Sequence, residues 1–150
     1  MSNRLSAYEK ALQLLKIRLQ SAGELKEKLA RKGYSPTEIK QALQKLEKLG
    51  LVDDLRYAKA FILARDRFRP RARKVLELEL RKQGIDKETI TRAFKSLENQ
   101  RDEEAILKEL IRRQEGKYRG LPKEVARRRL LSFLARRGFR WSQIKKWLKG

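Results

Sequence analysis

The sequence predicts an all-α protein made of three tandem three-helix repeats, each similar to a helix-turn-helix, that form an elongated array. Leu, Lys, Arg, Glu, Gln and Ala dominate its 150 residues, and these residue types favour helices. The chain has only eight Gly and three Pro, and the Val, Ile and Thr that favour strands are sparse. One motif also occurs three times, at 24–43, 75–94 and 129–148.

The three copies of the motif align on Gly33, Gly84 and Gly138. Leu stands eight and four residues before each glycine, and a large apolar residue follows the glycine directly. Ile stands six residues after it and a large apolar residue ten after it. This spacing predicts a helix with a buried stripe, a left-handed glycine that ends it, and a second helix. The matched residues are Leu25, Leu76, Leu130, Leu29, Leu80, Leu134, Tyr34, Ile85, Phe139, Ile39, Ile90, Ile144, Leu43, Phe94 and Leu148.

A further amphipathic helix precedes each copy of the motif, over residues 5–19, 54–68 and 102–114. Their apolar faces are formed by Tyr8, Leu12, Leu15 and Leu19, then by Ala58, Phe61, Ile62 and Phe68, and finally by Ile106, Leu107, Leu110 and Ile111. Candidate linkers lie at 50–54, 97–101 and 116–122, which assigns the repeats to residues 1–50, 51–100 and 101–150. Repeats this small cannot each bury a large core, so we expect neighbouring repeats to touch.

Capping residues mark the expected helix starts. Ser21 with Glu24, and Ser35 with Glu38, have the spacing of capping boxes. The other candidate caps are Asp53 or Asp54, Asp86, and Asp102. The third copy has Arg140 at the corresponding place, which is a poor cap.

The charge balance is strongly basic, with 40 Lys and Arg against 19 Asp and Glu and a formal net charge of +21. The excess is +6 in residues 1–50, +5 in 51–100 and +10 in 101–150, so it belongs to a folded body rather than to a tail. Such a surface attracts nucleic acid or an acidic protein. The alternative is that the charge merely keeps a helix-rich surface soluble.

The chain has no Cys and no His, which excludes disulfides, thiol and imidazole catalysis, and zinc sites of nitrogen or sulfur ligands. We expect no metal, no cofactor and no catalytic residue, although a metal nuclease of carboxylates alone stays open. No stretch is apolar enough to span a membrane, and the first residues lack the apolar core of a secretion signal. A cytoplasmic monomer that is not an enzyme is therefore expected.

Clusters of cations are the candidate binding residues. Arginines crowd the turn around Pro70, and arginine binds phosphate or carboxylate with two parallel hydrogen bonds. Basic pairs also precede each motif glycine, where the alternative is that they only complement the helix dipole. The candidate residues are Arg65, Arg67, Arg69, Arg71, Arg73, Lys74, Arg31, Lys32, Arg81, Lys82, Arg127, Arg128, Arg136 and Arg137. We expect that replacing Arg69, Arg71 and Arg73 with Ala weakens binding and leaves stability unchanged.

Two tryptophans near the C-terminus lie among cations and could stack on single-stranded bases. The repeat places Trp147 directly before the apolar Leu148, which favours packing or partial exposure for that residue. For Trp141 the two interpretations are equally supported.

The ordered set of motifs resembles the RecX family over nearly the whole chain. The stretch GLVDDLRYAKAFILAR at 50–65 resembles the family signature, with an acidic pair at Asp53 and Asp54 and a tyrosine at Tyr57. RKGYSPTEI at 31–39, LRKQGIDKETI at 80–90 and LARRGFRWSQIKKWL at 134–148 are similar to its repeat turns. We interpret the acidic pair as a helix cap and Tyr57 as a core aromatic.

The resemblance implies a fold of three three-helix repeats and a role in DNA recombination, repair and the SOS response. It implies a regulator, as a rule an inhibitor, that binds the filament of RecA on single-stranded DNA and modulates its ATPase, strand-exchange and co-protease activities. Single- and double-stranded DNA are further expected partners. The family brings no catalytic residue to this chain.

The alternative function is a DNA-binding protein of the transcription-factor type, either tolerant of sequence or using one helix-turn-helix for recognition. Against the second form, Glu38 and Glu88 lie at the start of the would-be recognition helices and would repel phosphate. Three tandem copies also suit a surface that follows a filament better than one that reads a single operator.

Overall fold

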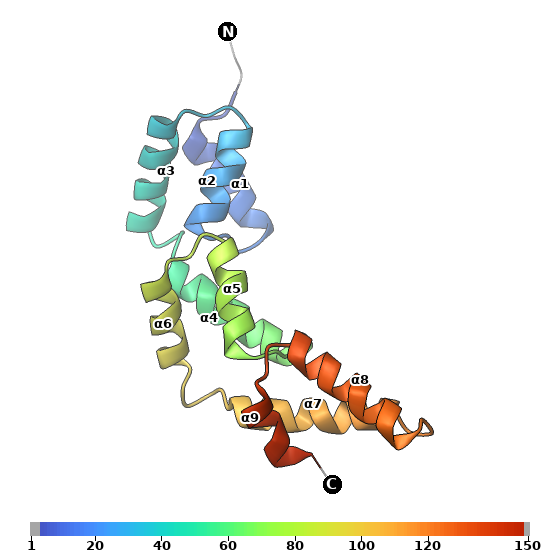
Figure 1. Cartoon of the computed structure of the whole chain (residues 1–150). Coiled ribbons are helices and arrows are strands. Elements are labelled where there is room, and N and C mark those ends of the chain that lie inside the picture. Colours follow the sequence, from blue (N-terminus) through green and yellow to red (C-terminus); the bar gives the residue numbers. More distant parts are fainter. Residues whose placement is uncertain (1–3, 149–150) are drawn as a thin grey trace. The chain divides into compact units, whose positions relative to one another are not determined.

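The computed structural model describes residues 4–148, in which every regular element is a helix. The first repeat comprises α1 (Ala7–Ile17), α2 (Ala22–Arg31) and α3 (Pro36–Lys48), and the second α4 (Asp54–Phe68), α5 (Arg73–Lys82) and α6 (Lys87–Ser96). The third comprises α7 (Glu103–Lys117), α8 (Lys123–Arg136), α9 (Trp141–Ile144) and the 3-10 helix η1 (Lys145–Trp147) (Figure 1). The predicted all-α class and its three three-helix repeats are confirmed.

The helices form two compact units that divide the second repeat between them. Unit 1 consists of Met1–Ala60 with Leu80–Lys95, and unit 2 of Phe61–Glu79 with Ser96–Gly150. The beginning of α4 and the end of α5 therefore belong with the first repeat, whereas the end of α4 and the beginning of α5 belong with the third. The boundaries expected at residues 50 and 100 stay a prediction.

The glycine turns form as the spacing predicts. Gly33, Gly84 and Gly138 have φ of 91°, 83° and 88°, in the left-handed region that glycine adopts without strain. In each turn the residue after the glycine donates its N–H to the leucine carbonyl five residues earlier, which closes the helix end. These bonds join Tyr34 to Leu29, Ile85 to Leu80, and Phe139 to Leu134, at 3.2, 3.2 and 3.1 Å.

Each unit has its own core, built from the residues that the motif marks. In unit 1 the core contains Leu25, Leu29, Tyr34 and Ile39, packed with Ala7 and Ala11 of α1. In unit 2 it contains Leu130, Leu134, Phe139 and Ile144, packed with Leu107, Leu110 and Ile111 of α7. The repeated stripe therefore supplies the packing that holds the helices of these two repeats together.

The helix starts follow the expected caps. Ser21 and Glu24 form the complete capping box of α2, and the Ser35 side chain accepts from the Glu38 N–H. Asp86 caps α6 and Asp102 caps α7 by accepting from the N–H three residues on. Ser6 with Glu9 forms a capping box for α1 that the sequence analysis did not anticipate. Arg140 is followed by a helix of only four residues, in keeping with its poor capping ability.

The apolar face expected on α1 packs against the core through the half-buried Tyr8, Leu12 and Leu15, and Ala7 and Ala11 are buried as well. Two expectations about the helices were wrong. Helix α7 continues through Gly116 to Lys117, because nothing crowds that glycine and helical backbone remains available to it. Phe68, expected on the buried face of α4, is 72% exposed because it lies at the very end of the helix.

Gly23 packs closely against the backbone of the turn that follows α5. A Cβ at Gly23 would lie 2.8 Å from the Gly84 Cα and 2.9 Å from the Gln83 carbonyl oxygen. The Ser21 hydroxyl donates to that same carbonyl over 2.7 Å. The start of α2 therefore lies directly against the turn that follows α5. The space beside the Gly23 Cα admits a hydrogen atom but not a methyl group.

Gly23→Ala should destabilise the protein even though alanine favours helix by about 1 kcal/mol. The new methyl group meets backbone that cannot move aside, and overpacking of this kind costs about 1–3 kcal/mol. Urea denaturation followed by circular dichroism should show a lower midpoint. Gly116→Ala is the matched control, because it adds the same methyl group to a helix in open space and should raise the midpoint. A Gly23→Ala protein as stable as wild type would contradict the close approach.

Candidate polyanion-binding surface

Asp53 and Asp54, the acidic pair of the sequence motif, have different partners. Asp53 accepts a hydrogen bond from the Arg56 N–H over 3.1 Å, which is the expected helix cap. Asp54 accepts instead from the N–H of Ala22, the first residue of α2, over 2.9 Å. Burial raises the pKa of Asp54, and the Ala22 N–H opposes that shift. The second aspartate therefore joins the start of α4 to the start of α2 within unit 1.

Tyr57 is a core aromatic, as expected, and it is also hydrogen-bonded. It is 7% exposed, and burial together with a hydrogen bond to Glu24 raises the pKa of its hydroxyl to about 12. Glu24 also forms an ion pair with Arg18, with 2.7 Å between Oε2 and Nη2. Asp54 and Tyr57 thus serve the contact between the first and second repeats, whereas Asp53 caps its own helix.

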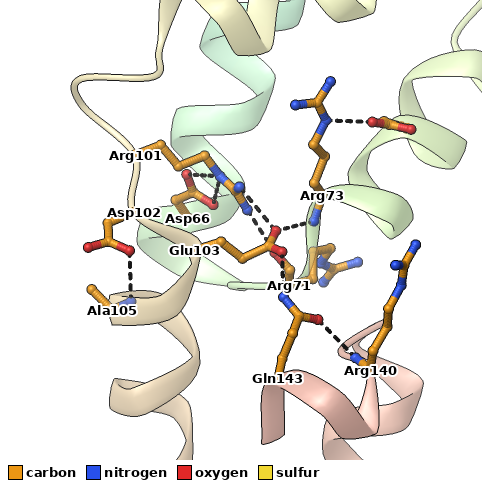
Figure 2. Close-up of polar contacts among 10 residues, drawn as sticks. Asp66, Arg71, Arg73, Arg101, Asp102, Glu103, Ala105, Arg140 and Gln143 are labelled. Atoms are coloured by element: carbon orange, nitrogen blue, oxygen red, sulfur yellow. Dashed lines mark hydrogen bonds and ion pairs between the residues drawn. The ribbon is translucent and has the colours of Figure 1, made fainter.

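In unit 2, Arg101 is the centre of the corresponding contact (Figure 2). Its guanidinium pairs with Asp66 of α4 at 2.9 Å and with Glu103 of α7 at 3.2 Å, and it donates to the Arg71 carbonyl at 3.0 Å. The Arg101 side chain is only 7% exposed. Burial raises the pKa of Asp66, and the positive charge of Arg101 opposes that rise. One buried arginine therefore connects the end of α4, the turn before α5 and the start of α7.

Glu103 extends this network to two more helix starts. Its carboxylate accepts from the N–H of Arg73 at 2.5 Å and from the side-chain amide of Gln143 at 3.1 Å. The Gln143 oxygen in turn accepts from the Arg140 N–H at 2.9 Å, at the beginning of α9 (Figure 2). Both carboxylate oxygens of Glu103 therefore accept hydrogen bonds from other residues of the protein.

The turn after α8 lies against the start of α5. The Ala72 N–H donates to the Arg137 carbonyl over 2.8 Å, and Arg137 Nη1 donates to the Pro70 carbonyl over 3.1 Å. A Cβ at Gly138 would lie 2.5 Å from a methyl carbon of Val75. The motif glycine of the third repeat is therefore needed both for its turn and for this close packing.

These contacts gather two separate groups of candidate residues into one arginine cluster, which we define as Arg69, Arg71, Arg136 and Arg137. Burial lowers the pKa of Arg137, and the positive charges of Arg71, Arg69 and Arg136 lower it further. Arg137 at the end of α8 therefore lies within electrostatic range of the arginines of the α4–α5 turn. Its hydrogen bond to the carbonyl of Pro70, which stands between Arg69 and Arg71, also places it at this turn.

Acids inside unit 2 neutralise only part of the cluster. Glu79 pairs with Arg71 at 2.8 Å and with the adjacent Arg65 at 3.1 Å. Within residues 4–148, neither Arg69 nor Arg136 forms an ion pair with an acid; Arg136 donates only to the Ser132 hydroxyl. Both side chains belong to exposed residues. They are the cluster members that an external anion can reach.

The other candidate residues are placed separately. Arg31, Lys32, Arg81 and Lys82 are exposed residues of unit 1, and Arg67, Arg73, Lys74, Arg127 and Arg128 are exposed residues of unit 2. Arg31 pairs with Glu27, and Arg73 with Glu77 at 2.6 Å. For the basic pairs at the ends of α2 and α5, complementing the helix dipole stays an adequate explanation.

The two tryptophans differ in exposure. Trp147 is half-buried, with the Lys108 ammonium 4.3 Å from its ring centroid, which agrees with partial packing. Trp141 is 52% exposed.

Sequence reasoning missed Arg101, Glu79, Glu103 and Gln143. The expected linker at 97–101 includes Arg101, whose partner in the structure is Asp66. The one available signal was that Asp66 is the sole acid among the cations of 65–74. Its partner lies 35 residues away, beyond the range of helix periodicity.

No group of three or more acids suited to a metal ion occurs within residues 4–148. In the same part of the chain, no helix combines the length and the apolar character needed to cross a membrane.

Comparison with known proteins agrees with this architecture repeat by repeat. Models of the first, second and third three-helix domains of RecX match residues 7–46, 53–93 and 102–148. A regulatory protein RecX of Amycolatopsis mediterranei is 34% identical over 133 residues, which cover 89% of this chain and 75% of the relative. One of Pelodictyon phaeoclathratiforme is 33% identical over 139 residues, covering 93% and 84%.

The chain belongs to the RecX family. The crystal structure of RecX from Lactobacillus salivarius has the same fold, with a TM-score of 0.78 and 22% identity over 93% of this chain and 90% of that one. The models of the second and third RecX domains begin at Asp53 and Asp102, which are the residues that cap α4 and α7 here. The regulatory role of the family applies to this chain.

Arg101→Met should destabilise this RecX protein strongly, because it leaves Asp66 and Glu103 without their buried partner. Removing one member of a buried ion pair costs about 3–5 kcal/mol. Thermal unfolding of the whole protein should show a large fall in the melting temperature. Arg113→Met is the matched control: Arg113 pairs with Glu109 at the surface, and exposed pairs contribute about 0–1 kcal/mol. Equal melting temperatures for the two variants would show that Arg101 is not structurally important.

Proposed function

We propose that this protein regulates RecA by binding the filament that RecA forms on single-stranded DNA, and that it inhibits strand exchange, ATP hydrolysis and co-protease activity. Family membership supports a regulatory role, and the RecX resemblance implies RecA as the target. The proposed mode of action is binding without catalysis, by a monomer in the cytoplasm.

The observation that carries the proposal is the arginine cluster of unit 2. Arg137 lies within electrostatic range of Arg69, Arg71 and Arg136, and Glu79, the acid that acts on it, already pairs with Arg65 and Arg71. Arginine forks match phosphate and carboxylate oxygens, so the cluster suits the phosphates of a DNA strand or acids on a protein. We assign the first contact with the filament to Arg69 and Arg136, with Arg67, Lys74, Arg127 and Arg128 as further cations of the same unit.

Adding the purified protein to RecA on single-stranded DNA should slow ATP hydrolysis at or below a one-to-one ratio. The physical reason is that a regulator spanning the filament changes how its subunits engage the strand. Turnover is measured by phosphate release, and filament length by electron microscopy. Unchanged turnover together with unchanged filament length would contradict the proposed target.

Direct binding to DNA should be salt-sensitive and nearly blind to sequence. Each phosphate neutralised contributes roughly −0.7 to −0.9 to the slope of log K against log salt. Fluorescence anisotropy with labelled single-stranded and duplex oligonucleotides measures this slope. A strong preference for one duplex sequence would favour a transcription factor instead.

The cluster should carry this binding. Arg71 pairs with Glu79 and its side chain is only 16% exposed, so replacing Arg69, Arg71 and Arg73 together would also affect stability, contrary to our expectation from the sequence. We therefore choose the double variant Arg69→Ala with Arg136→Ala, which should weaken DNA binding and leave the melting temperature unchanged. The slope of log K against log salt should become shallower by the contribution of about 2 phosphate contacts.

Arg112→Ala with Arg119→Ala is the control for that double variant. It removes the same charge from exposed arginines of the same unit, and Glu109 keeps Arg113 as a partner. Equal loss of DNA affinity in the two double variants would mean that net charge, not the cluster, drives binding. Loss of DNA affinity with RecA inhibition intact would identify RecA protein as the contact.

A further inference from the structure

Phe68 ends α4 with its ring in solvent, directly beside the arginine cluster. The residue is 72% exposed, although its aromatic side chain would ordinarily contribute to a core. A single exposed apolar residue needs no explanation by itself. The surroundings of this ring are what distinguish it.

Arginines flank Phe68 on both sides along the chain. The Arg67 guanidinium carbon lies 5.2 Å from the ring centroid, within the range of cation–π attraction. Arg69, on the other side, belongs to the cluster and has no acidic partner within residues 4–148. The exposed ring therefore lies beside one guanidinium, and the residue that follows it in the chain carries a second.

Another exposed apolar residue of unit 2 has the opposite surroundings. Leu78 of α5 is 59% exposed, but it stands between Glu77 and Glu79 and has no aromatic face. Both residues are exposed, but of these two only Phe68 combines an aromatic ring with adjacent cations.

We propose that Phe68 is a stacking platform for a base of single-stranded nucleic acid, with Arg67 supporting the ring and Arg69 contacting the neighbouring phosphate. This inference rests on the proposed nucleic-acid contact and specifies that the protein touches a base of the strand as well as a phosphate. Aromatic rings stack on any base, so the contact is tolerant of sequence. A paired base is already stacked within its duplex, so the ring gives a preference for single strands.

Fluorescence anisotropy with a labelled oligothymidylate tests the proposal. Phe68→Ala should weaken binding by about 5- to 150-fold, the range that corresponds to loss of one stacked base. The slope of log K against log salt should not change, because no phosphate contact is removed. Duplex affinity should also stay the same. Oligouridylate should lose affinity by the same factor, because stacking does not involve the sugar hydroxyl; loss on DNA alone would overturn a base-stacking role.

An oligonucleotide without bases separates stacking from other effects. On this abasic strand, wild type and Phe68→Ala should bind equally, because the ring has nothing to stack on. Phe68→Leu keeps an apolar side chain without an aromatic face and should behave like Phe68→Ala, whereas Phe68→Trp should retain affinity. Phe68→Leu with full affinity would overturn the proposal, as would Phe68→Ala losing as much on the abasic strand as on thymidylate.

Leu78→Ala is the matched control and should bind oligothymidylate like wild type. The Phe68→Trp and Phe68→Leu variants keep the test decisive if Phe68→Ala unfolds. Failure of this inference is distinct from failure of the proposed function. If wild type and Phe68→Ala bind the strand equally and both inhibit RecA, only the stacking site is wrong. If wild type binds no oligonucleotide, the underlying nucleic-acid contact is wrong as well.

Discussion

The shortage of acids is the constraint on which the arrangement of unit 2 depends. The chain has 40 Lys and Arg for 19 Asp and Glu, so each acid that pairs with a buried arginine is no longer available to pair with a cation at the surface. Asp66 and Glu103 are committed to Arg101, and Glu79 is committed to Arg65 and Arg71. Burying an arginine without such partners would be costly. Beside these pairs, the exposed Arg69 and Arg136 have no acid partner within residues 4–148, and it is our proposal that they bind an external anion.

The contacts between successive repeats use different chemistry in the two units. In unit 1 two glycine backbones meet, and a serine hydroxyl and an aspartate complete the contact with hydrogen bonds to backbone. In unit 2 a motif glycine meets the Val75 side chain, and a buried arginine with two acids joins the helix starts. Both contacts need a glycine with no room for a Cβ. The ionic contact also means that the arginines of unit 2 are not one class: Arg101 is structural, whereas Arg69 and Arg136 have no acid partner within residues 4–148.

Local spacing was sufficient to predict most of the fold. Leucines at i and i+4 before a glycine define a buried stripe and a helix end whatever lies elsewhere in the chain, so the three turns and their core residues could be found from the sequence. Pairings across the fold could not. Asp66 and Arg101 are 35 residues apart, and Gln143 and Glu103 are 40 apart, and no helical period connects such positions. Phe68 was misplaced for a related reason: helical spacing assigns it to the apolar face, but it is the last residue of the helix and is 72% exposed.

For the candidate surface, composition indicated the kind of ligand and clusters of arginine indicated where to look. The division of those arginines into paired and unpaired members required the structure, because it depends on which acids are brought near. Arg69 and Arg71 are two residues apart and have similar sequence surroundings, yet only Arg71 reaches Glu79. Arg136 and Arg69 are far apart in sequence and act on the same neighbour, Arg137.

The most direct test of this division is an NMR titration that follows the arginine side-chain Nε–Hε signals of the folded protein as a single-stranded oligonucleotide is added. The structure predicts that the signals of Arg69 and Arg136 shift with saturation at a common affinity, while the signal of Arg101 stays in place. Movement of the Arg101 signal while those of Arg69 and Arg136 remain unchanged would contradict the assignment of structural and binding roles.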